Sequence, residues 1–146
     1  MWGDPVREKS KAQTYLEQVA KLDALIECKQ TEQQQWRDLA QSITAGMGGE
    51  RVQASGSQSK LADAVAKCVD MEGEIAAVID SLIATKSEVV HTIEQVDNAT
   101  EYKLLHMRYI QHLPLKVIAD RFISDYTWAT TTHGRAIKSV EAIMAK

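Results

Sequence analysis

Apolar residues recur at alternating steps of three and four along the first third of the chain. They lie at Ala12, Tyr15, Val19, Leu22 and Ile26, and the spacing returns at Trp36, Ala40, Ile43 and Met47. Lys29 and Gln33 occupy the positions between these two runs. An apolar stripe with this spacing follows one face of an α-helix. The pattern therefore predicts one long amphipathic helix over about residues 5–45, beginning near Pro5, with a polar patch in its middle.

A second heptad stripe covers the middle of the chain, at Leu61, Val65, Cys68, Ile75, Ile79, Leu82, Val89, Ile93 and Val96. Glu72 and Lys86 interrupt it, and the spacing predicts a helix over about residues 58–95. Between the two helices, residues 44–60 are rich in glycine and serine, which predicts a loop. Two long helices with one apolar face each bury those faces by folding back on each other. We therefore predict an antiparallel helical hairpin over residues 1–97.

The hairpin geometry also predicts which side chains lie opposite each other. A fold-back centred near residue ~52 separates Cys68 from Cys28 by ~12 Å along the helix axis. A disulfide cannot span that offset, so both thiols are expected to be free, with Cys68 in the seam. The same geometry places Lys29 and Gln33 near residues ~75 and ~71. There they either form a buried polar layer with Glu72 or lie exposed to solvent.

The last third of the chain has shorter helical patterns, separated by residues that cap or break helices. Asn98 and Glu101 have the spacing of a capping box, which predicts a third helix over about residues 99–111. Pro114 ends that helix and begins a fourth, over about residues 114–122.

A fifth helix is expected after Ser124 or Asp125, since either residue can cap its N-terminus. Its apolar face consists of Ala129, Ala136, Ile137, Val140 and Ile143. A short helix, a turn of about three residues and a longer capped helix are the layout of a helix-turn-helix. The predicted fold class is therefore all-α: a long, coiled-coil-like antiparallel helical hairpin, then a small helix-turn-helix unit over residues 98–146.

Composition narrows the class of protein further. Of the 146 residues, 45% are hydrophobic and 25% charged, as in ordinary globular proteins. No apolar run reaches the ~18 residues of a membrane span, and the first residues are too polar for a secretory signal. Two cysteines without a disulfide framework indicate a reducing compartment. We therefore expect a cytoplasmic protein with no membrane partner.

The sequence contains no recognisable catalytic constellation. His91, His106, His112 and His133 are scattered, and no two of them have the i, i+4 spacing of a helical metal site. Neither cysteine has a histidine at ligand spacing. The glycines of residues 44–60 are not followed by the Lys and Ser/Thr of a phosphate-binding loop. We therefore expect no enzymatic activity, no metal and no other cofactor.

Charge differs between the two predicted regions. Residues 1–97 contain 10 Lys/Arg and 16 Asp/Glu, whereas residues 98–146 contain 7 and 4. An acidic arm joined to a mildly basic binding head would have this distribution. Two ordinary solvated surfaces would have it as well.

Three stretches of the C-terminal region resemble region 4 of sigma factors. They are Tyr102-Lys-Leu-Leu-His-Met-Arg-Tyr-Ile110, Val117-Ile-Ala119 and His133-Gly-Arg-Ala-Ile137. More closely, they look like the small sigma-like regulators coded by phages and mobile elements of Gram-positive bacteria. In that group an Arg-Tyr-Ile motif precedes the first helix of the helix-turn-helix.

The hairpin shares in this resemblance. The stretches Arg51-Val-Gln-Ala-Ser-Gly-Ser-Gln-Ser-Lys60 and Leu61-Ala-Asp-Ala-Val-Ala66 are similar to a small phage protein family of poorly defined function. The chain departs from the family at the helix-turn-helix turn, where Ile123-Ser-Asp125 replaces Gly-Tyr-Ser. It departs again in the second helix, because Tyr126-Thr-Trp-Ala-Thr-Thr-Thr132 is uncharged.

The resemblance implies a DNA-binding transcription regulator that acts at promoters together with RNA polymerase. Helix-turn-helix proteins lay the N-terminal half of the second helix into the major groove. With Ala129, Ala136 and Val140 as the buried phase, the outward residues are Tyr126, Thr127, Thr130, Thr131, Arg135 and Lys138. Threonine and arginine side chains can read bases. Phosphate contacts are expected from Arg135 and Lys138, and from Lys116 and Arg121 of the preceding helix.

Other interpretations remain open at this stage. The helix-turn-helix can be a scaffold in a protein-binding adaptor, whose hairpin or loop engages a host protein. The chain can also be a structural coiled-coil oligomer, with the hairpin closing on itself or pairing with a second copy as a homodimer. Trp128 lies either at the DNA interface or on the small core, and we favour the core because exposed tryptophan is costly.

Overall fold

The computed structural model describes residues 9–47 and 54–146, and all the regular secondary structure in these ranges is helical. The expected all-α class is confirmed: two long helices pack antiparallel, and short helices follow them. The helical segments are α1 (Lys11–Leu16), α2 (Gln18–Met47), α3 (Ala54–Glu94), α4 (Ala99–Leu105), the π-helical turn η1 (His106–Ile110), α5 (Leu115–Arg121) and α6 (Tyr126–Met144). None of the helices in the described ranges is both long and apolar enough to cross a bilayer.

The chain divides into two compact units. The hairpin unit is residues 22–82, and the helix-turn-helix unit combines residues 1–21 with residues 83–146. This division differs from the single boundary at residue 97 that the sequence favours. The difference arises because α1 packs against α6 within the helix-turn-helix unit.

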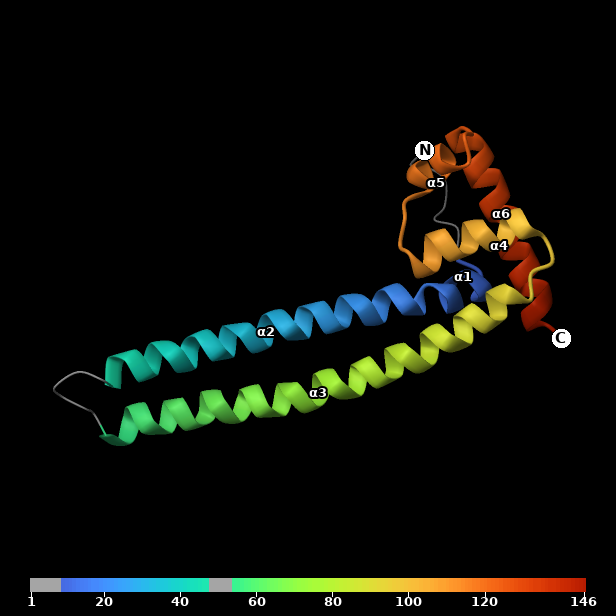
Figure 1. Cartoon of the computed structure of the whole chain (residues 1–146). Helices are drawn as coiled ribbons and strands as arrows, with labels where there is room; N and C mark the ends of the chain where they lie inside the picture. The colour runs from blue at the N-terminus through green and yellow to red at the C-terminus, as the bar shows by residue number, and fades with distance from the viewer. Residues whose placement is uncertain (1–8, 48–53) are drawn as a thin grey trace, which may run out of the picture. The chain divides into compact units, whose positions relative to one another are not determined.

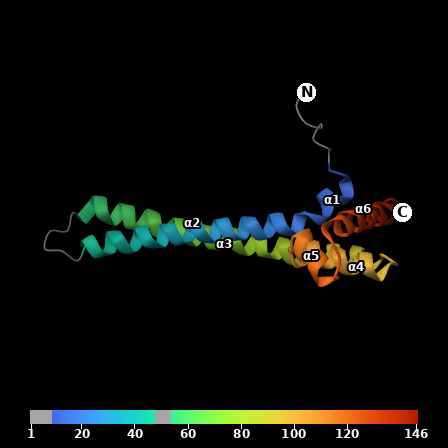
Figure 2. The ribbon, with the colours of Figure 1, turned by 90° about the horizontal axis from the view of Figure 1, so that it is seen from above.

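In the hairpin unit, α2 and α3 run side by side in opposite directions (Figures 1 and 2). The side chains buried between them are Gln33, Ala64, Met71 and Ile75. Both cysteines are free, as expected: Cys28 is exposed and Cys68 is half-buried. A heptad seam thus organises this unit, but two residues predicted to lie in it do not: Val65 and Ile79 are exposed, and the neighbouring Ala64 and Val78 face α2 instead. Apolar spacing alone could not separate these two phases, because α3 carries apolar residues in both.

The predicted loop over residues 44–60 is too long. Helix α2 continues to Met47 and α3 begins at Ala54, so most of this stretch is helical. Within this stretch, residues 48–53 lie outside the described part of the chain. The glycines Gly46 and Gly56 are helical and exposed. Each lowers helix stability by about 1 kcal/mol relative to alanine. Ile43 and Ser57, which precede and follow the undescribed residues on α2 and α3, are half-buried.

The first predicted helix, residues 5–45, is interrupted. Helix α1 is capped by Ser10, whose hydroxyl accepts a hydrogen bond from the Gln13 backbone N–H, and it ends at Leu16. Glu17 forms a turn, and α2 starts at the next residue. The break lets α1 bury Ala12 and Leu16 in the helix-turn-helix unit, which apolar spacing alone does not reveal. The predicted start at Pro5 lies outside the described residues.

A polar layer lies in the hairpin seam. The side-chain amide of Gln33 is buried and donates to the backbone carbonyl of Cys68, at 3.1 Å. One turn earlier, the Lys29 ammonium pairs with the Glu74 carboxylate at 3.1 Å. Glu72 is exposed. The layer predicted for Lys29 and Gln33 therefore forms with Cys68 and Glu74 rather than with Glu72.

The helix-turn-helix unit has its own core, to which every helix of the unit contributes. Its fully buried large side chains are Leu16, Val19, Val89, Ile93, Leu104, Leu105, Ile118 and Val140. The N-terminal segment is fixed to α3 by a hydrogen bond of 3.0 Å between the hydroxyls of Tyr15 and Thr92. Because core residues come from positions 16–19 and 89–140, folding of this unit requires segments from both ends of the chain.

The segment before the helix-turn-helix starts as predicted and ends differently. The Asn98 side chain caps α4 by accepting from the Glu101 backbone N–H at 3.0 Å. The predicted helix 99–111 then changes from α to π geometry at His106. A π-helical turn places an extra residue in the helix and is common near functional sites. His112 follows with a φ of 58°, and Pro114 is the N-cap of α5.

Candidate nucleic-acid interface

Helix α5 is the first helix of the helix-turn-helix. It follows Pro114, whose fixed φ of −64° suits a helix start and whose carbonyl accepts from the Ile118 backbone N–H. Ile118 and Ala119 face the core and are buried. Lys116 and Arg121 are exposed. The helix therefore presents two cations to solvent while its apolar residues attach it to the unit.

The turn after α5 is a Schellman motif. The Ser124 backbone N–H donates to the Ala119 carbonyl at 2.9 Å, and the Ile123 N–H donates to the Asp120 carbonyl at 3.1 Å. This pair of bonds requires a left-handed residue directly after the helix C-cap, a position that usually holds glycine. Here that residue is Ile123, with a φ of 54°. The turn thus has the usual Schellman geometry, but isoleucine is an unusual residue at its left-handed position.

Helix α6 begins at an aspartate cap. The Asp125 carboxylate accepts from the Trp128 backbone N–H at 2.8 Å. This cap satisfies one of the free N–H groups of the first turn, and its negative charge favours the positive end of the helix dipole. Of the two capping residues that the sequence allows, the structure uses Asp125. The cap fixes where α6 starts and therefore which of its side chains face outward.

The buried and exposed faces of α6 are well separated. Its buried residues are Ala129, Thr132, Ala136, Ile137 and Val140. Four of the five predicted core residues of this helix are among them, and Ile143 is half-buried. Thr132 was not expected in the core. The threonine-rich stretch is therefore divided, because Thr127, Thr130 and Thr131 are exposed.

All eight residues proposed to contact DNA are exposed. They are Lys116 and Arg121 on α5, and Tyr126, Thr127, Thr130, Thr131, Arg135 and Lys138 on α6. The fractional exposure of Tyr126 is 59%, although its side chain is an aromatic ring. These side chains are free to meet a ligand, and they come from the two helices that pack together as the helix-turn-helix.

Trp128 packs on the small core, as we expected. It lies against the buried cluster of Leu104, Met107 and Ile118. Its ring meets that of Phe122, with centroids 5.0 Å apart and planes inclined by 49°. Such tilted pairs are favourable for aromatic rings. Trp128 therefore helps to hold α6 against α5.

A groove with cationic side chains lies between α4, η1 and α5. Tyr102, Lys103, His106, Arg121 and Phe122 line this groove, together with Met107 and Gln111. The Lys103 ammonium lies 5.7 Å from the centre of the Phe122 ring, a cation–π distance. No sequence signal marks Lys103, because its position relative to Arg121 depends on how the helices pack.

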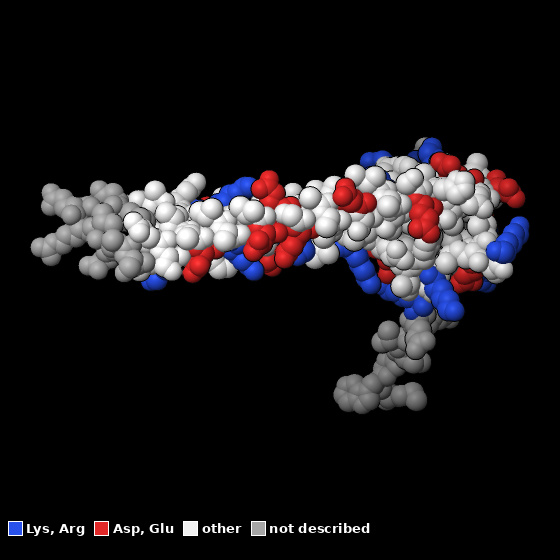
Figure 3. All heavy atoms as spheres, turned by 90° about the horizontal axis from the view of Figure 1, so that it is seen from below, with Lys and Arg blue, Asp and Glu red and all other residues white. Residues whose placement is uncertain are grey.

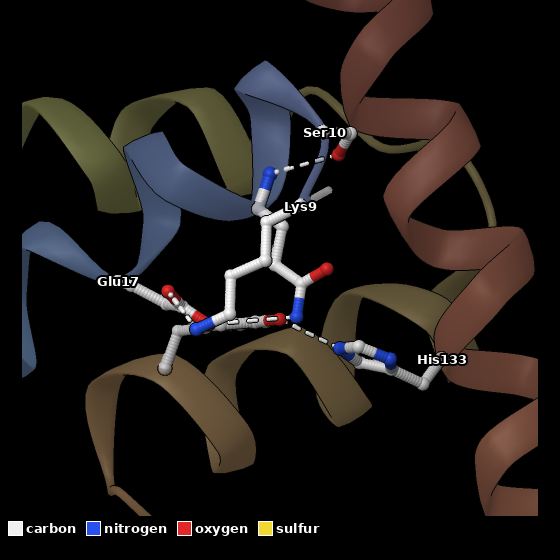
Figure 4. A network of polar contacts seen from close by, with 6 residues as sticks. Lys9, Ser10, Glu17 and His133 are labelled. Atoms are coloured by element: carbon white, nitrogen blue, oxygen red, sulfur yellow. Dashed lines mark hydrogen bonds and ion pairs between the residues drawn. The ribbon is translucent and has the colours of Figure 1, made fainter. Parts of the chain in front are cut away.

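A polar network joins the N-terminal segment, η1 and α6. The Tyr109 hydroxyl and His133 Nε2 are 2.6 Å apart, and their rings are stacked. Lys9 and Glu17 form an ion pair of 2.9 Å. Figure 4 shows this pair on the N-terminal segment and His133 across from it on α6. Burial lowers the pKa of His133, and the nearby Arg108 cation lowers it further, against the opposing effect of Glu17. Nothing in the sequence distinguishes His133 from the other three histidines, because Tyr109 is brought to it only by the fold.

Surface charge differs between the two units. Residues 22–82 contain 5 Lys/Arg and 10 Asp/Glu, so the hairpin unit is acidic. On the face drawn in Figure 3, the Lys and Arg side chains of the helix-turn-helix unit lie at several separate places, with acidic side chains between them. On that face the cations do not form one continuous area.

The fold and the site define a class: an all-α protein with an antiparallel helical hairpin and a helix-turn-helix unit. Comparisons with protein-family models, curated proteins and solved structures found no match for this chain. Functional assignment therefore depends on the geometry described above.

Proposed function

We propose that the helix-turn-helix unit binds double-stranded promoter DNA, and that the protein is a transcription regulator of a phage or mobile element acting with RNA polymerase. The observation that carries this proposal is the division of α6 into a buried face and an exposed face. The exposed face holds threonines near the helix N-terminus, followed by Arg135 and Lys138. The sequence resemblance to sigma region 4 supports the same function.

Each part of the exposed surface has a role in this proposal. Tyr126, Thr127, Thr130 and Thr131 occupy the first turns of α6, the part that enters the major groove in helix-turn-helix complexes. Their hydroxyl and methyl groups contact base edges. Lys116, Arg121, Arg135 and Lys138 contact phosphates and fix the orientation of the unit on the duplex.

The small number of cations limits the expected salt dependence. Each phosphate neutralised by Lys or Arg contributes a slope of about −0.9 to log K against log salt concentration, so these four cations give at most about −3.6 per unit. Affinity should therefore be moderate and should fall with added salt. Base contacts by threonine, rather than charge, would carry most of the specificity.

The test is a mobility-shift and footprinting screen of the DNA that neighbours the gene, with salt varied. The double variant Arg135→Ala with Lys138→Ala should weaken binding on all sequences and flatten the salt slope by about 2. Lys67→Ala, an exposed lysine of the hairpin unit, is the matched control and should change neither. Absence of retardation at the lowest salt concentration would contradict the proposal, because phosphate contacts are strongest there.

A second candidate function is a protein-binding adaptor, favoured by the acidic hairpin unit. Leu25 and Leu39 on α2 are exposed by 42% and 45% in that unit. An adaptor should capture a stoichiometric host protein that is lost on Leu25→Glu with Leu39→Glu and retained by the Arg135→Ala, Lys138→Ala variant. The opposite pattern, with DNA retained by the leucine variant and lost by the arginine–lysine variant, favours the regulator.

A further inference from the structure

Helix α3 carries two heptad-spaced stripes rather than one. The first stripe faces α2 and contains the buried Ala64, Met71 and Ile75 with the half-buried Cys68 and Val78. The second is displaced by one residue and is open to solvent. Its apolar side chains in the hairpin unit are Val65, Val69 and Ile79, exposed by 48%, 62% and 36%.

The second stripe continues along the same helix. Its full set, at alternating steps of four and three, is Val65, Val69, Glu72, Ala76, Ile79, Ile83, Lys86 and Val90. Ile83 is exposed by 63%, Lys86 is exposed and Val90 is half-buried. Because α3 is one helix from Ala54 to Glu94, this stripe extends for about 38 Å at the usual rise per residue.

A helix with a single packed neighbour needs only one apolar stripe. A second stripe with heptad spacing is typical of a helix with a further helical neighbour. Contiguous exposed apolar patches, unlike single exposed apolar residues, mark interaction sites. In the described part of the hairpin unit, the second stripe remains exposed.

We propose that the second stripe binds a second copy of this chain, with the two α3 helices antiparallel. The two charged residues of the stripe argue for this occupant and this direction. A parallel, in-register pair of α3 helices would place Glu72 against Glu72 and Lys86 against Lys86. An antiparallel pair that matches all eight stripe positions is centred between Ala77 and Val78, and it sets Glu72 level with Ile83 of the second copy. Each Glu72 then lies only about 4.5 Å along the axis from Lys86 of the second copy, so the opposite charges attract. The antiparallel pair thus brings opposite charges together, whereas the parallel in-register pair brings like charges together.

This inference goes beyond DNA binding and does not depend on it. The dimer follows from the pattern of α3 alone, and each copy keeps its own α2–α3 seam. Pairing through α3 would give a four-helix arrangement of two hairpins. The expected particle has twice the chain mass of 16.2 kDa.

Light scattering coupled to size-exclusion chromatography on the full chain, in the absence of DNA, tests the proposal. The wild type should be dimeric in the micromolar range. Ile83→Glu should raise the dissociation constant at least about tenfold, as for a buried interface anchor. Leu39→Glu changes a similarly exposed apolar residue on α2 and should leave the dimer intact. Circular dichroism verifies that both variants are folded.

A charge swap tests the direction of the pair. Lys86→Glu alone should weaken the dimer, because it places two carboxylates near each other at both ends of the interface. Combining it with Glu72→Lys should restore the dissociation constant to near the wild-type value. A monomer through the high-micromolar range overturns the proposal, as does loss of the dimer on Leu39→Glu rather than Ile83→Glu. A failure of the swap to restore association overturns the antiparallel arrangement.

Discussion

The Tyr109 hydroxyl lies 2.6 Å from Nε2 of His133, although the two residues are 24 positions apart in the chain. Tyr109 belongs to the π-helical turn, and His133 lies near the middle of α6. Burial raises the pKa of Tyr109, so its hydroxyl stays protonated. A neutral imidazole can accept from this hydroxyl or donate to it, whereas an imidazolium can only donate. The Tyr109–His133 hydrogen bond can therefore form in either direction only when His133 is neutral.

The stability of the protein should fall as pH drops below the ordinary histidine pKa of 6.5. The pKa of His133 is lower in the folded state, chiefly because of burial, so the unfolded chain binds a proton first. Above 6.5 neither state binds the proton and there is no penalty. Between the two pKa values the free energy of unfolding decreases, and below the folded value the loss is complete. Urea unfolding followed by circular dichroism at a series of pH values measures this dependence.

His133→Gln provides the decisive comparison for this pH effect. Glutamine keeps a hydrogen-bonding group near Tyr109 but does not titrate, so its unfolding curve should vary less below the histidine pKa. His91→Gln removes an exposed histidine of α3 and should retain the wild-type dependence. The charged groups around His133 (Arg108, Glu17, Lys9, Lys138 and Glu141) are unchanged in both variants. Equal pH dependence in wild type and His133→Gln would contradict the assignment.

Ile123→Gly should stabilise the helix-turn-helix unit by roughly 1 kcal/mol, because a left-handed backbone costs an L-residue about 1–2 kcal/mol and glycine almost nothing. The isoleucine side chain is 94% exposed, so its removal loses no packing. Greater freedom of glycine in the unfolded chain offsets part of the gain. Thermal unfolding measures the net effect.

Ile123→Val is the control for the turn, since valine is also β-branched and retains the conformational cost at a φ of 54°. Its melting temperature should match the wild type. A loss of stability in the glycine variant would show that Ile123 makes a contribution other than backbone strain.

A hairpin with Gln33 should be less stable than one with an apolar residue at this position. In exchange, Gln33 fixes the register of α2 against α3. Its buried amide donates to the Cys68 carbonyl, between the apolar side chains of α2 and α3 and one turn from the Lys29–Glu74 ion pair. Buried polar residues at such positions specify register at a cost in stability. Gln33→Leu is therefore expected to raise the free energy of unfolding by about 1 kcal/mol, whereas Gln33→Ala should lower it by about 1–2 kcal/mol through lost packing and hydrogen bonding.

Urea unfolding of these two seam variants separates the two contributions. Gln34→Ala, at the adjacent exposed position, serves as the control and should change stability little. A Gln33→Leu variant less stable than the wild type would show that the amide hydrogen bond outweighs the cost of burying the amide.

Periodicity and capping residues were enough to predict the hairpin and the helix-turn-helix. The spacing of apolar residues identifies which face of a helix is buried, and Asn98 and Asp125 mark helix starts through local hydrogen bonds. Neither signal identifies the partner of a buried face. The break at Glu17 depends on packing of α1 against α6, which is a contact between opposite ends of the chain.

The candidate site was predicted in part for the same reason. The outward residues of α6 follow from its helical phase, and all six are exposed. The Tyr109–His133 contact and the groove that joins Lys103 to Arg121 involve residues brought together only by tertiary packing. Exposure shows that the outward residues are available to a ligand, and their role in DNA binding stays a prediction.

Gly134→Ala should stabilise α6, because Gly134 lies in the helix interior and is exposed. A methyl group at its Cα would meet no atom within 4 Å, so no steric cost opposes the change. Alanine in place of glycine inside a helix is worth about 0.5–1 kcal/mol. Gly73→Ala in α3 has equally open surroundings and should give a similar gain in thermal stability. If both variants are stabilised but only Gly134→Ala loses DNA affinity, a ligand approaches the α6 backbone closely at this position.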